Sequence, residues 1–168
     1  AMYSKRQEIT NLSNAITFLG TETLRNLILQ IAVVKLFQFE DDDLPEFSID
    51  TFWEHSLGTA YFTGLLVKKL NLPNDDNYYI GGLLHDIGKL LIYQIYPDKF
   101  KEIVLRQIND DIVDTEAEEL VLGLAHHDIG AFLAEKWKFK AVILDSIRDH
   151  HKTSSALSVN AAIVRISN

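Results

Sequence analysis

The stretch Leu83-Leu84-His85-Asp86-Ile87-Gly88-Lys89-Leu90 places an imidazole next to a carboxylate inside a strongly apolar segment. Burying these two polar groups costs free energy unless each of them finds a partner. A metal ion is one such partner, because imidazole nitrogen and carboxylate oxygen are common metal ligands. Core hydrogen bonds are the other, so His85 and Asp86 taken alone leave both interpretations open.

The number of histidines does not decide between these interpretations. The chain has six, and four of them form the adjacent pairs His126-His127 and His150-His151. Such residues can bind a shared ion, cap helix ends or make core hydrogen bonds. An α-helix turns by about 100° per residue, so we expect only one of His126 and His127 to face a shared site. His150 and His151 can both face it if their helix ends there.

Charge and composition exclude several classes of protein. The net charge is −8 and the basic residues are scattered, so we expect no long nucleic-acid partner, although a single nucleotide remains compatible. The absence of cysteine excludes disulfides, thiolate zinc sites and cysteine nucleophiles, and it fits a reducing compartment. We find no secretory signal pattern and no apolar stretch of the roughly 18 residues that a membrane helix needs. We therefore predict a cytoplasmic protein without a membrane segment.

Helical spacing of apolar residues runs through the whole chain, and glycine and proline are sparse, with 8 and 3 copies. No segment alternates with the period of a strand, so we predict an all-α fold and a single domain over residues 1–168. The helices are expected at about residues 9–19, 21–39, 51–70, 77–94, 97–109 and 115–137, in a short segment before His150, and from about Leu157 onward. The apolar pattern still runs at Ile166-Ser167-Asn168, so we expect the domain to be part of a longer chain.

Local signals predict where some helices begin and which aromatic rings they bury. Thr51 with Glu54, and Thr115 with Glu118, have the spacing of a capping box and predict two helix starts. The like-charge run at residues 40–45 predicts a solvated loop. Five aromatic residues at helical spacing are expected in the core: Trp53, Phe62, Tyr78, Phe132 and Trp137.

The order of the motifs resembles the HD superfamily and, within it, the HDOD branch. His55 followed by His85-Asp86 is similar to the HD signature, in which a histidine on one helix and the His-Asp pair on the next bind a metal. The likeness to HDOD domains extends from Ile9 to Asn168. It rests on four segments: Ala15-Ile16 to Leu19-Gly20, Trp53-Glu54-His55-Ser56 with Ala60, Gly123 to His126 with Gly130 and Trp137, and Ile147 to His151. The resemblance implies an HD-superfamily-like helical bundle and favours His126 over His127 in the site.

The related HD-GYP phosphodiesterases resemble this chain at further ligand positions. Together, the two resemblances imply a set of metal ligands: His55, His85, Asp86, His126, His150 and His151. The final aspartate of the HD-GYP centre corresponds to Asn168, which offers only a neutral carbonyl oxygen, and the Gly-Tyr-Pro segment after His151 is missing. The resemblance implies one or two divalent ions, and donors of this kind accept Fe, Mn, Ni or Zn.

Three functions are compatible with such a pocket. We favour a signal-transduction module that binds a signalling protein or a small nucleotide, because the chain resembles HDOD domains, which are regarded as output modules without an established reaction. The alternative is a metal-dependent phosphohydrolase that acts on a cyclic dinucleotide or another nucleotide. The third is a structural domain with a hydrogen-bonded histidine cluster.

For the phosphohydrolase, Asp86 and Lys89 are the catalytic candidates. A bound ion lowers the pKa of its water toward ~7. Lys89 follows Asp86 by three residues and is expected on the same helix face, where its ammonium could hold a phosphate. It could equally be a surface lysine. Asp128 and Asp149 could orient neighbouring imidazoles or remain solvated.

Overall fold

The structure, a computed structural model, describes residues 31–37, 47–73, 76–153 and 157–168 and, before them, residues 16, 20, 21, 24 and 28. Within these ranges every regular element is a helix, which confirms the all-α prediction. The labelled helices are α2 (Ile49–Lys69), α3 (Asn77–Leu84), α4 (Ile87–Ile95), α5 (Pro97–Asp110), α6 (Asp114–Leu122), α7 (His126–Lys136), α8 (Ala141–Asp149) and α9 (Val159–Ser167). None of these helices is long and apolar enough to cross a membrane.

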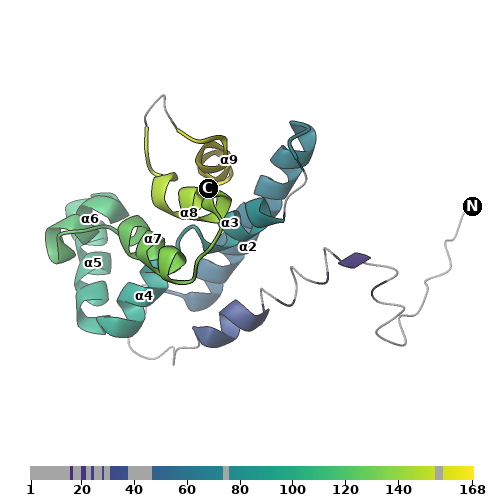
Figure 1. The fold of residues 1–168 in the computed structure, drawn as a ribbon. Helices are drawn as coiled ribbons and strands as arrows, with labels where there is room; N and C mark the ends of the chain where they lie inside the picture. The colour runs from purple at the N-terminus through teal and green to yellow at the C-terminus, as the bar shows by residue number, and fades with distance from the viewer. Residues whose placement is uncertain are drawn as a thin grey trace, which may run out of the picture.

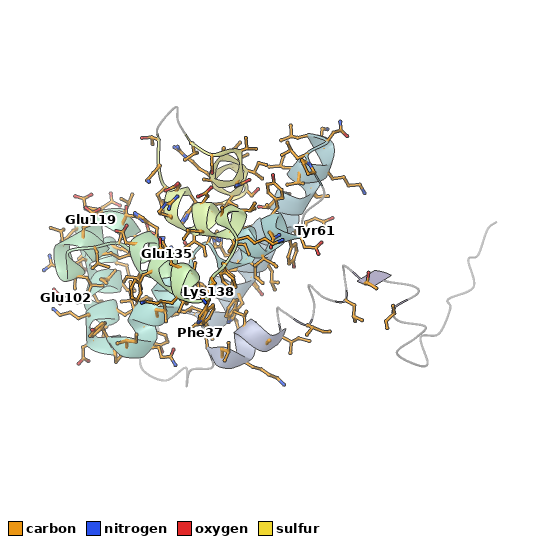
Figure 2. All side chains as sticks on the ribbon, viewed as in Figure 1. Phe37, Tyr61, Glu102, Glu119, Glu135 and Lys138 are labelled. Atoms are coloured by element: carbon orange, nitrogen blue, oxygen red, sulfur yellow. The ribbon has the colours of Figure 1, made fainter. Side chains whose placement is uncertain are left out.

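The N-terminal predictions lie mostly outside the described residues. This applies to the helix expected at 9–19, to much of the helix expected at 21–39 and to the loop expected at 40–45. Residues 31–36 are helical, in agreement with the second of these helices. Phe37 packs into the core next to this segment (Figure 2). The prediction of a single domain within a longer chain stays a prediction.

The stretch that contains the His-Asp pair runs through the middle of the helical bundle. In Figure 1, α3 lies between α2 and α8, and α4 packs against α7. The hairpin of α5 and α6 forms one end of the molecule, and α9 covers α2 and α8 on another side. Leu83, Leu84 and Leu90 are almost completely buried in the core that these helices share. The apolar residues around the His-Asp pair therefore fix its position at the centre of the fold.

The helix predicted at residues 77–94 is two helices, because the chain breaks at His85-Asp86. The ring of His85 bonds to the carbonyl oxygen of Gly82 at 2.8 Å. The backbone N–H of Lys89 bonds to the carbonyl oxygen of Asp86 at 2.9 Å, which starts α4. In a continuous helix the two side chains would point about 100° apart. The break lets both of them face the same side.

The helix predicted at residues 115–137 is also divided, at Gly123. Its φ of 79° lies in the left-handed region, which favours glycine and ends α6. The expected capping box of Thr115 and Glu118 is wrong, because the Glu118 carboxylate bonds to His126 at the start of α7. Glu118 therefore bonds to a residue of the next helix instead of capping the start of α6, as the local pattern had predicted.

The start of α2 also differs from the prediction. The side chain of Ser48 accepts a hydrogen bond from the backbone N–H of Thr51 at 3.2 Å, so Ser48 is the capping residue. The expected capping box of Thr51 and Glu54 is wrong, because Thr51 already lies in the first turn. The helix start at Pro97 is confirmed.

The five aromatic residues that were predicted to lie in the core divide into buried and exposed ones. Trp53 and Tyr78 are buried, as predicted. The prediction is wrong for Phe62, Phe132 and Trp137, which are 56%, 62% and 43% exposed. Phe62 follows Trp53 by nine residues, which is about 180° around α2, so the two cannot share a face. Tyr61 marks this outer side of α2 in Figure 2.

Two glycines permit the close helix contacts that bring the polar residues together. A Cβ at Gly88 would overlap the backbone carbonyl of His126, lying 2.7 Å from its carbon, so α4 touches the start of α7 directly. A Cβ at Gly82 would lie 2.9 Å from Cα of Ala60, so α3 also approaches α2 closely. These two contacts set the distances between side chains that the four helices direct inward.

Candidate metal centre

Polar residues from separate parts of the chain meet in one place. They comprise one from α2, the pair at the α3–α4 junction, one at the start of α7 and two just after α8: His55, His85, Asp86, His126, His150 and His151. Ligand atoms of Asp86, His126, His150 and His151 all lie within 4.8 Å of one another, and those of His55, His85 and Asp86 do so as well. The structure thus brings together all the residues that the sequence suggested as metal ligands.

Asp86 belongs to both groups and is 3% exposed. Its Oδ1 lies 3.1 Å from Nε2 of His126 and 3.3 Å from Nε2 of His150. Its Oδ2 lies 3.5 Å from Nε2 of His85 and 4.0 Å from Nε2 of His55. Among the described residues, Oδ1 has no hydrogen-bond partner of acceptable geometry. A buried carboxylate oxygen that faces ring nitrogens in this way fits a cation between them.

The buried imidazoles of His85, His150 and His126 are each held at Nδ1. Their acceptors are the carbonyl oxygens of Gly82 and Ile147, both at 2.8 Å, and the carboxylate of Glu118, at 2.7 Å. Because the carbonyls can only accept, Nδ1 carries the proton, and a neutral ring then presents a lone pair at Nε2. In metal sites the same kind of bond fixes the ring of a histidine ligand and raises its basicity.

The Nε2 atoms face one another across short distances. Nε2 of His126 is 3.1 Å from that of His151 and 3.4 Å from that of His150. On the other side of Asp86, the Nε2 atoms of His55 and His85 are 3.2 Å apart. Lone pairs repel at this range unless a proton or a metal ion lies between them. Imidazole nitrogens and a carboxylate oxygen are also the donor set that divalent transition metals accept.

Most charge states at the site suit metal binding near pH 7. Burial lowers the pKa of His85 to about 4. Burial and the nearby His150 and His126 lower the pKa of His151 to about 3. Burial by itself raises the pKa of Asp86, but its cationic neighbours hold that pKa well below the ordinary value. The two imidazoles are therefore neutral and the carboxylate is ionised, which are the ligating forms.

His126 differs from the other imidazoles because two carboxylates flank it. Burial lowers its pKa, but Asp86 and Glu118 outweigh burial and raise the pKa to about 9. Without a metal ion, His126 therefore holds a proton at neutral pH. A metal ion would have to displace that proton.

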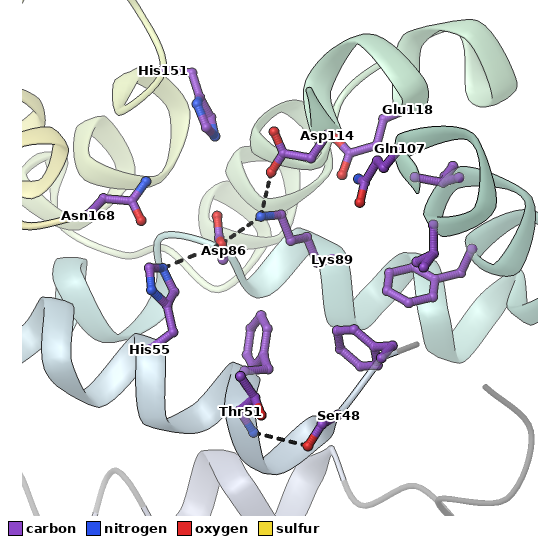
Figure 3. A pocket seen from close by; sticks show the side chains of 15 residues that line it. Ser48, Thr51, His55, Asp86, Lys89, Gln107, Asp114, Glu118, His151 and Asn168 are labelled. Carbon is purple, nitrogen blue, oxygen red and sulfur yellow. Dashed lines mark hydrogen bonds and ion pairs between the residues drawn. The ribbon is translucent and has the colours of Figure 1, made fainter. Parts of the chain in front are cut away.

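Lys89 bridges two carboxylates at the wall of the site (Figure 3). Its Nζ lies 2.8 Å from Oδ2 of Asp86 and 2.6 Å from Oδ2 of Asp114. Burial lowers the pKa of Lys89, but the two carboxylates outweigh burial and raise it. With 20% of its side chain exposed, Lys89 belongs to the pocket wall rather than to the open surface. The sequence offered no signal for Asp114, whose pairing with Lys89 depends on how α6 packs.

Three of the candidate metal ligands, His55, Asp86 and His151, line a pocket of about 520 Å³. Its other end is aromatic: the ring of Phe47 lies 4.8 Å from that of Phe100 and 6.3 Å from that of Phe52, measured between centroids. Gln107 and Thr51 add polar groups to this part of the wall (Figure 3). The pocket therefore joins a metal-ligating end to an end that suits a flat apolar group.

A family model described as the HDOD domain matches residues 1–153. The chain belongs to the HDOD family. An HDOD domain protein of unknown function from Geobacter sulfurreducens has a similar solved structure, with a TM-score of 0.83 and 32% identity over 98% of this chain and 54% of that one. A candidate phosphohydrolase from Shewanella amazonensis is similar too, with a TM-score of 0.78 and 28% identity over 95% of this chain and 58% of that one.

Ribonuclease Y of Bacillus thuringiensis is 31% identical to this HDOD domain over 111 residues, which are 66% of this chain and 16% of the ribonuclease. The HDOD domain spans 30% or less of the length of curated relatives that it matches.

The HDOD resemblance favoured His126 over His127 in the site, and the structure places the two rings differently. The ring of His126 is completely buried and its Nε2 belongs to the ligand group. His127 lies outside both ligand groups, and burial lowers its pKa. The direction of the first turn of α7 separates the two rings.

Neither aspartate beside the histidine pairs orients a ligand imidazole in the HDOD domain. Asp149 pairs with Arg148 and Lys152, at 3.1 and 2.6 Å. Asp128 accepts the backbone N–H just before α7 at 3.4 Å. The carboxylate that holds a ligand ring is Glu118, which sequence reasoning assigned to a helix cap.

Proposed function

We propose that this HDOD domain is a signal-transduction module whose pocket binds divalent metal ions and whose occupied state is read by a partner protein. The observation that supports this most directly is the convergence of five imidazoles on Asp86. Burying these groups together is costly without a cation. A purely structural cluster would leave Asp86 Oδ1 close to the rings of His126 and His150 but without a hydrogen bond of acceptable geometry among the described residues.

The chain's own residues supply a prepared set of ligands. Fe, Mn, Ni and Zn are compatible with its nitrogen and oxygen donors. When bound, such an ion acts as a Lewis acid and lowers the pKa of a coordinated water. The Nδ1 bonds to Gly82, Ile147 and Glu118 hold three rings in place before any ion arrives.

The origin of the ligands supports a role in signalling. They come from α2, the α3–α4 junction, α7 and the end of α8. An ion that binds all of them stabilises one arrangement of these helices over others. A partner that binds that arrangement more tightly would detect the occupied pocket.

The aromatic end of the pocket supports a small nucleotide as the second ligand. A base could pack against Phe47 and Phe100 while Gln107 bonds to its polar edge. The phosphate would then lie toward the metal-ligating end. Phosphate oxygens are good partners for bound divalent ions but not for Asp86, Asp114 and Glu118 alone.

Metal content tests the proposal. The protein is purified without chelating tags or chelators and subjected to elemental analysis. We expect roughly one or two ions per chain, lost in the His85→Ala, Asp86→Ala double variant. The His127→Ala variant is the matched control, because it removes an adjacent imidazole that lies outside both ligand groups. A parent protein without metal would overturn the proposal.

A second candidate function is metal-dependent phosphodiester hydrolysis. It is supported by Lys89 beside Asp86 and by the likeness to the Shewanella phosphohydrolase candidate and to part of ribonuclease Y. We place it second because Lys89 is bound to Asp114 and Asn168 is uncharged. The net charge of −8 also disfavours a long RNA substrate.

Turnover of bis(p-nitrophenyl) phosphate with added Mn²⁺ separates the two candidates. Hydrolysis that His85→Ala abolishes and His127→Ala retains would establish the enzyme. Bound metal without turnover would leave the signalling module.

A further inference from the structure

We propose that Asn168 makes the two halves of the centre unequal. In this proposal the domain binds one divalent ion tightly, between Asp86, His126, His150 and His151, and a second one only weakly, at His55 and His85. The proposal rests on the proposed function, because it presupposes that the pocket binds metal.

The position of Asn168 is imposed by the last turn of α9. Its backbone N–H bonds to the carbonyl oxygen of Val164 at 2.8 Å. Val164 itself is completely buried, and Arg165 donates a hydrogen bond to the carbonyl of Lys152, just beyond the His-His pair. The helix is therefore anchored on both sides. Its end directs the amide of Asn168 into the pocket, opposite His55 (Figure 3).

The amide of Asn168 meets the metal-binding nitrogen of His85. Its Oδ1 position lies 3.2 Å from Nε2 of His85. Since Nδ1 of His85 donates to Gly82, Nε2 of the neutral ring carries a lone pair and needs a donor. The two ends of an amide exchange by a rotation of the group, and the hydrogen-bond partners decide which end faces inward. The arrangement that satisfies both groups has the NH₂ of Asn168 donating to Nε2.

Asn168 therefore competes with a metal ion for the lone pair of His85. An ion at this position would have to displace the N–H donor. In exchange it would gain a neutral carbonyl oxygen at most, which is a weak ligand for a transition metal. His55 cannot compensate, because its side chain is 40% exposed and no Nδ1 bond to it is seen in the described part of the chain.

In the other half of the centre, no side-chain amide among the described residues is bound to a ligand nitrogen. Asp86 contributes Oδ1, which has no hydrogen-bond partner among the described residues, and three imidazoles surround it. Glu118 holds the ring of His126 at 2.7 Å, and Ile147 holds that of His150 at 2.8 Å. One carboxylate and three imidazoles make the four ligands that a tetrahedral zinc site needs.

The number of Zn²⁺ ions retained per chain tests whether the two halves of the centre bind metal with unequal affinity. Metal-free protein is loaded with excess Zn²⁺, desalted and subjected to elemental analysis, and the affinities are measured by calorimetry. We expect roughly one retained ion per chain in the parent and in His55→Ala, and none in His151→Ala. Asn168→Asp should retain roughly two, with the second bound at least about tenfold more tightly than in the parent.

Asn160→Asp is the matched control, because it makes the same substitution on α9 outside the pocket lining. It should leave one ion. If Asn168→Asp does not fold, Asn168→Ala provides the second test, since removal of the donor alone should strengthen the second site.

The outcomes separate this inference from the proposed function. Two equally tight ions in the parent would refute the inference while supporting metal binding. A single ion in both Asn168→Asp and Asn168→Ala would also refute it. No ion in the parent would overturn the proposed function and the inference together.

Discussion

Glu118 and His126 are joined by two hydrogen bonds to the same carboxylate. Oε2 of Glu118 accepts both the backbone N–H and the ring Nδ1–H of His126, each at 2.7 Å, and Oε1 lies 3.0 Å from the same Nδ1. Glu118 is 2% exposed, so this pair is buried where α6 meets the first turn of α7. The pair fixes the orientation of the His126 ring from behind the candidate metal centre.

Removal of Glu118 should weaken metal binding without removing a ligand. In Glu118→Ala the ring of His126 is free to turn and loses its charged acceptor, so we expect the Zn²⁺ affinity to fall by about 10–100-fold. Calorimetric titration measures the change. Glu119→Ala removes the exposed neighbouring carboxylate and should have no effect. Equal affinities in the two variants would contradict the role of Glu118.

Metal affinity should rise with pH up to about 9. The pKa of metal-free His126 is raised to about 9, so at neutral pH an ion must displace a proton from it. His85 and His151, with pKa values lowered to about 4 and about 3, are already neutral and add no dependence in this range. The Zn²⁺ affinity should therefore increase roughly tenfold per pH unit up to about pH 9 and level off above it. A flat profile between about pH 7 and 9 would contradict the protonated state of His126.

Lys89→Met should change metal affinity and stability in opposite directions. Loss of the ammonium removes a competing cation from Asp86, so Zn²⁺ should bind at least about tenfold more tightly. The metal-free protein should lose about 2 kcal/mol, because the Lys89 ammonium no longer separates the carboxylates of Asp86 and Asp114. Urea unfolding and calorimetry measure the two effects.

Lys99→Met is the control for Lys89→Met. It breaks an exposed ion pair with Glu102 far from the ligand set, and both quantities should stay within error. Weaker metal binding in Lys89→Met would show that the lysine assists the ion instead of competing with it.

Two glycine substitutions should have opposite effects on stability. Gly88→Ala places a methyl group against the backbone of His126, so we expect a loss of about 2–3 kcal/mol and weaker metal binding. Gly58→Ala fills open space on α2, where no atom lies within 4 Å of the new Cβ, and should stabilise by about 0.5–1 kcal/mol. Urea unfolding of both variants measures the difference. A neutral Gly88→Ala would mean that α4 and α7 can separate without cost.

Local pattern predicted helical content better than it predicted helix boundaries. The start at Pro97 was correct, because the ring constraint of proline acts within the chain. The breaks at His85-Asp86 and at Gly123 were missed, since apolar spacing continues through both of them. Phe132 was assigned to the core from its spacing, but it lies on the side of α7 that faces away from α4 and α8.

The sequence by itself determined the helical class and the types of candidate metal ligand, because helical periodicity and donor chemistry are local properties of the chain. Only the tertiary structure decided which distant groups meet. It brought Asn168 to His85 across 83 residues, Asp114 to Lys89, and Glu118 to His126. These contacts depend on how closely the helices pack at Gly82 and Gly88, and no spacing along a single helix encodes that distance.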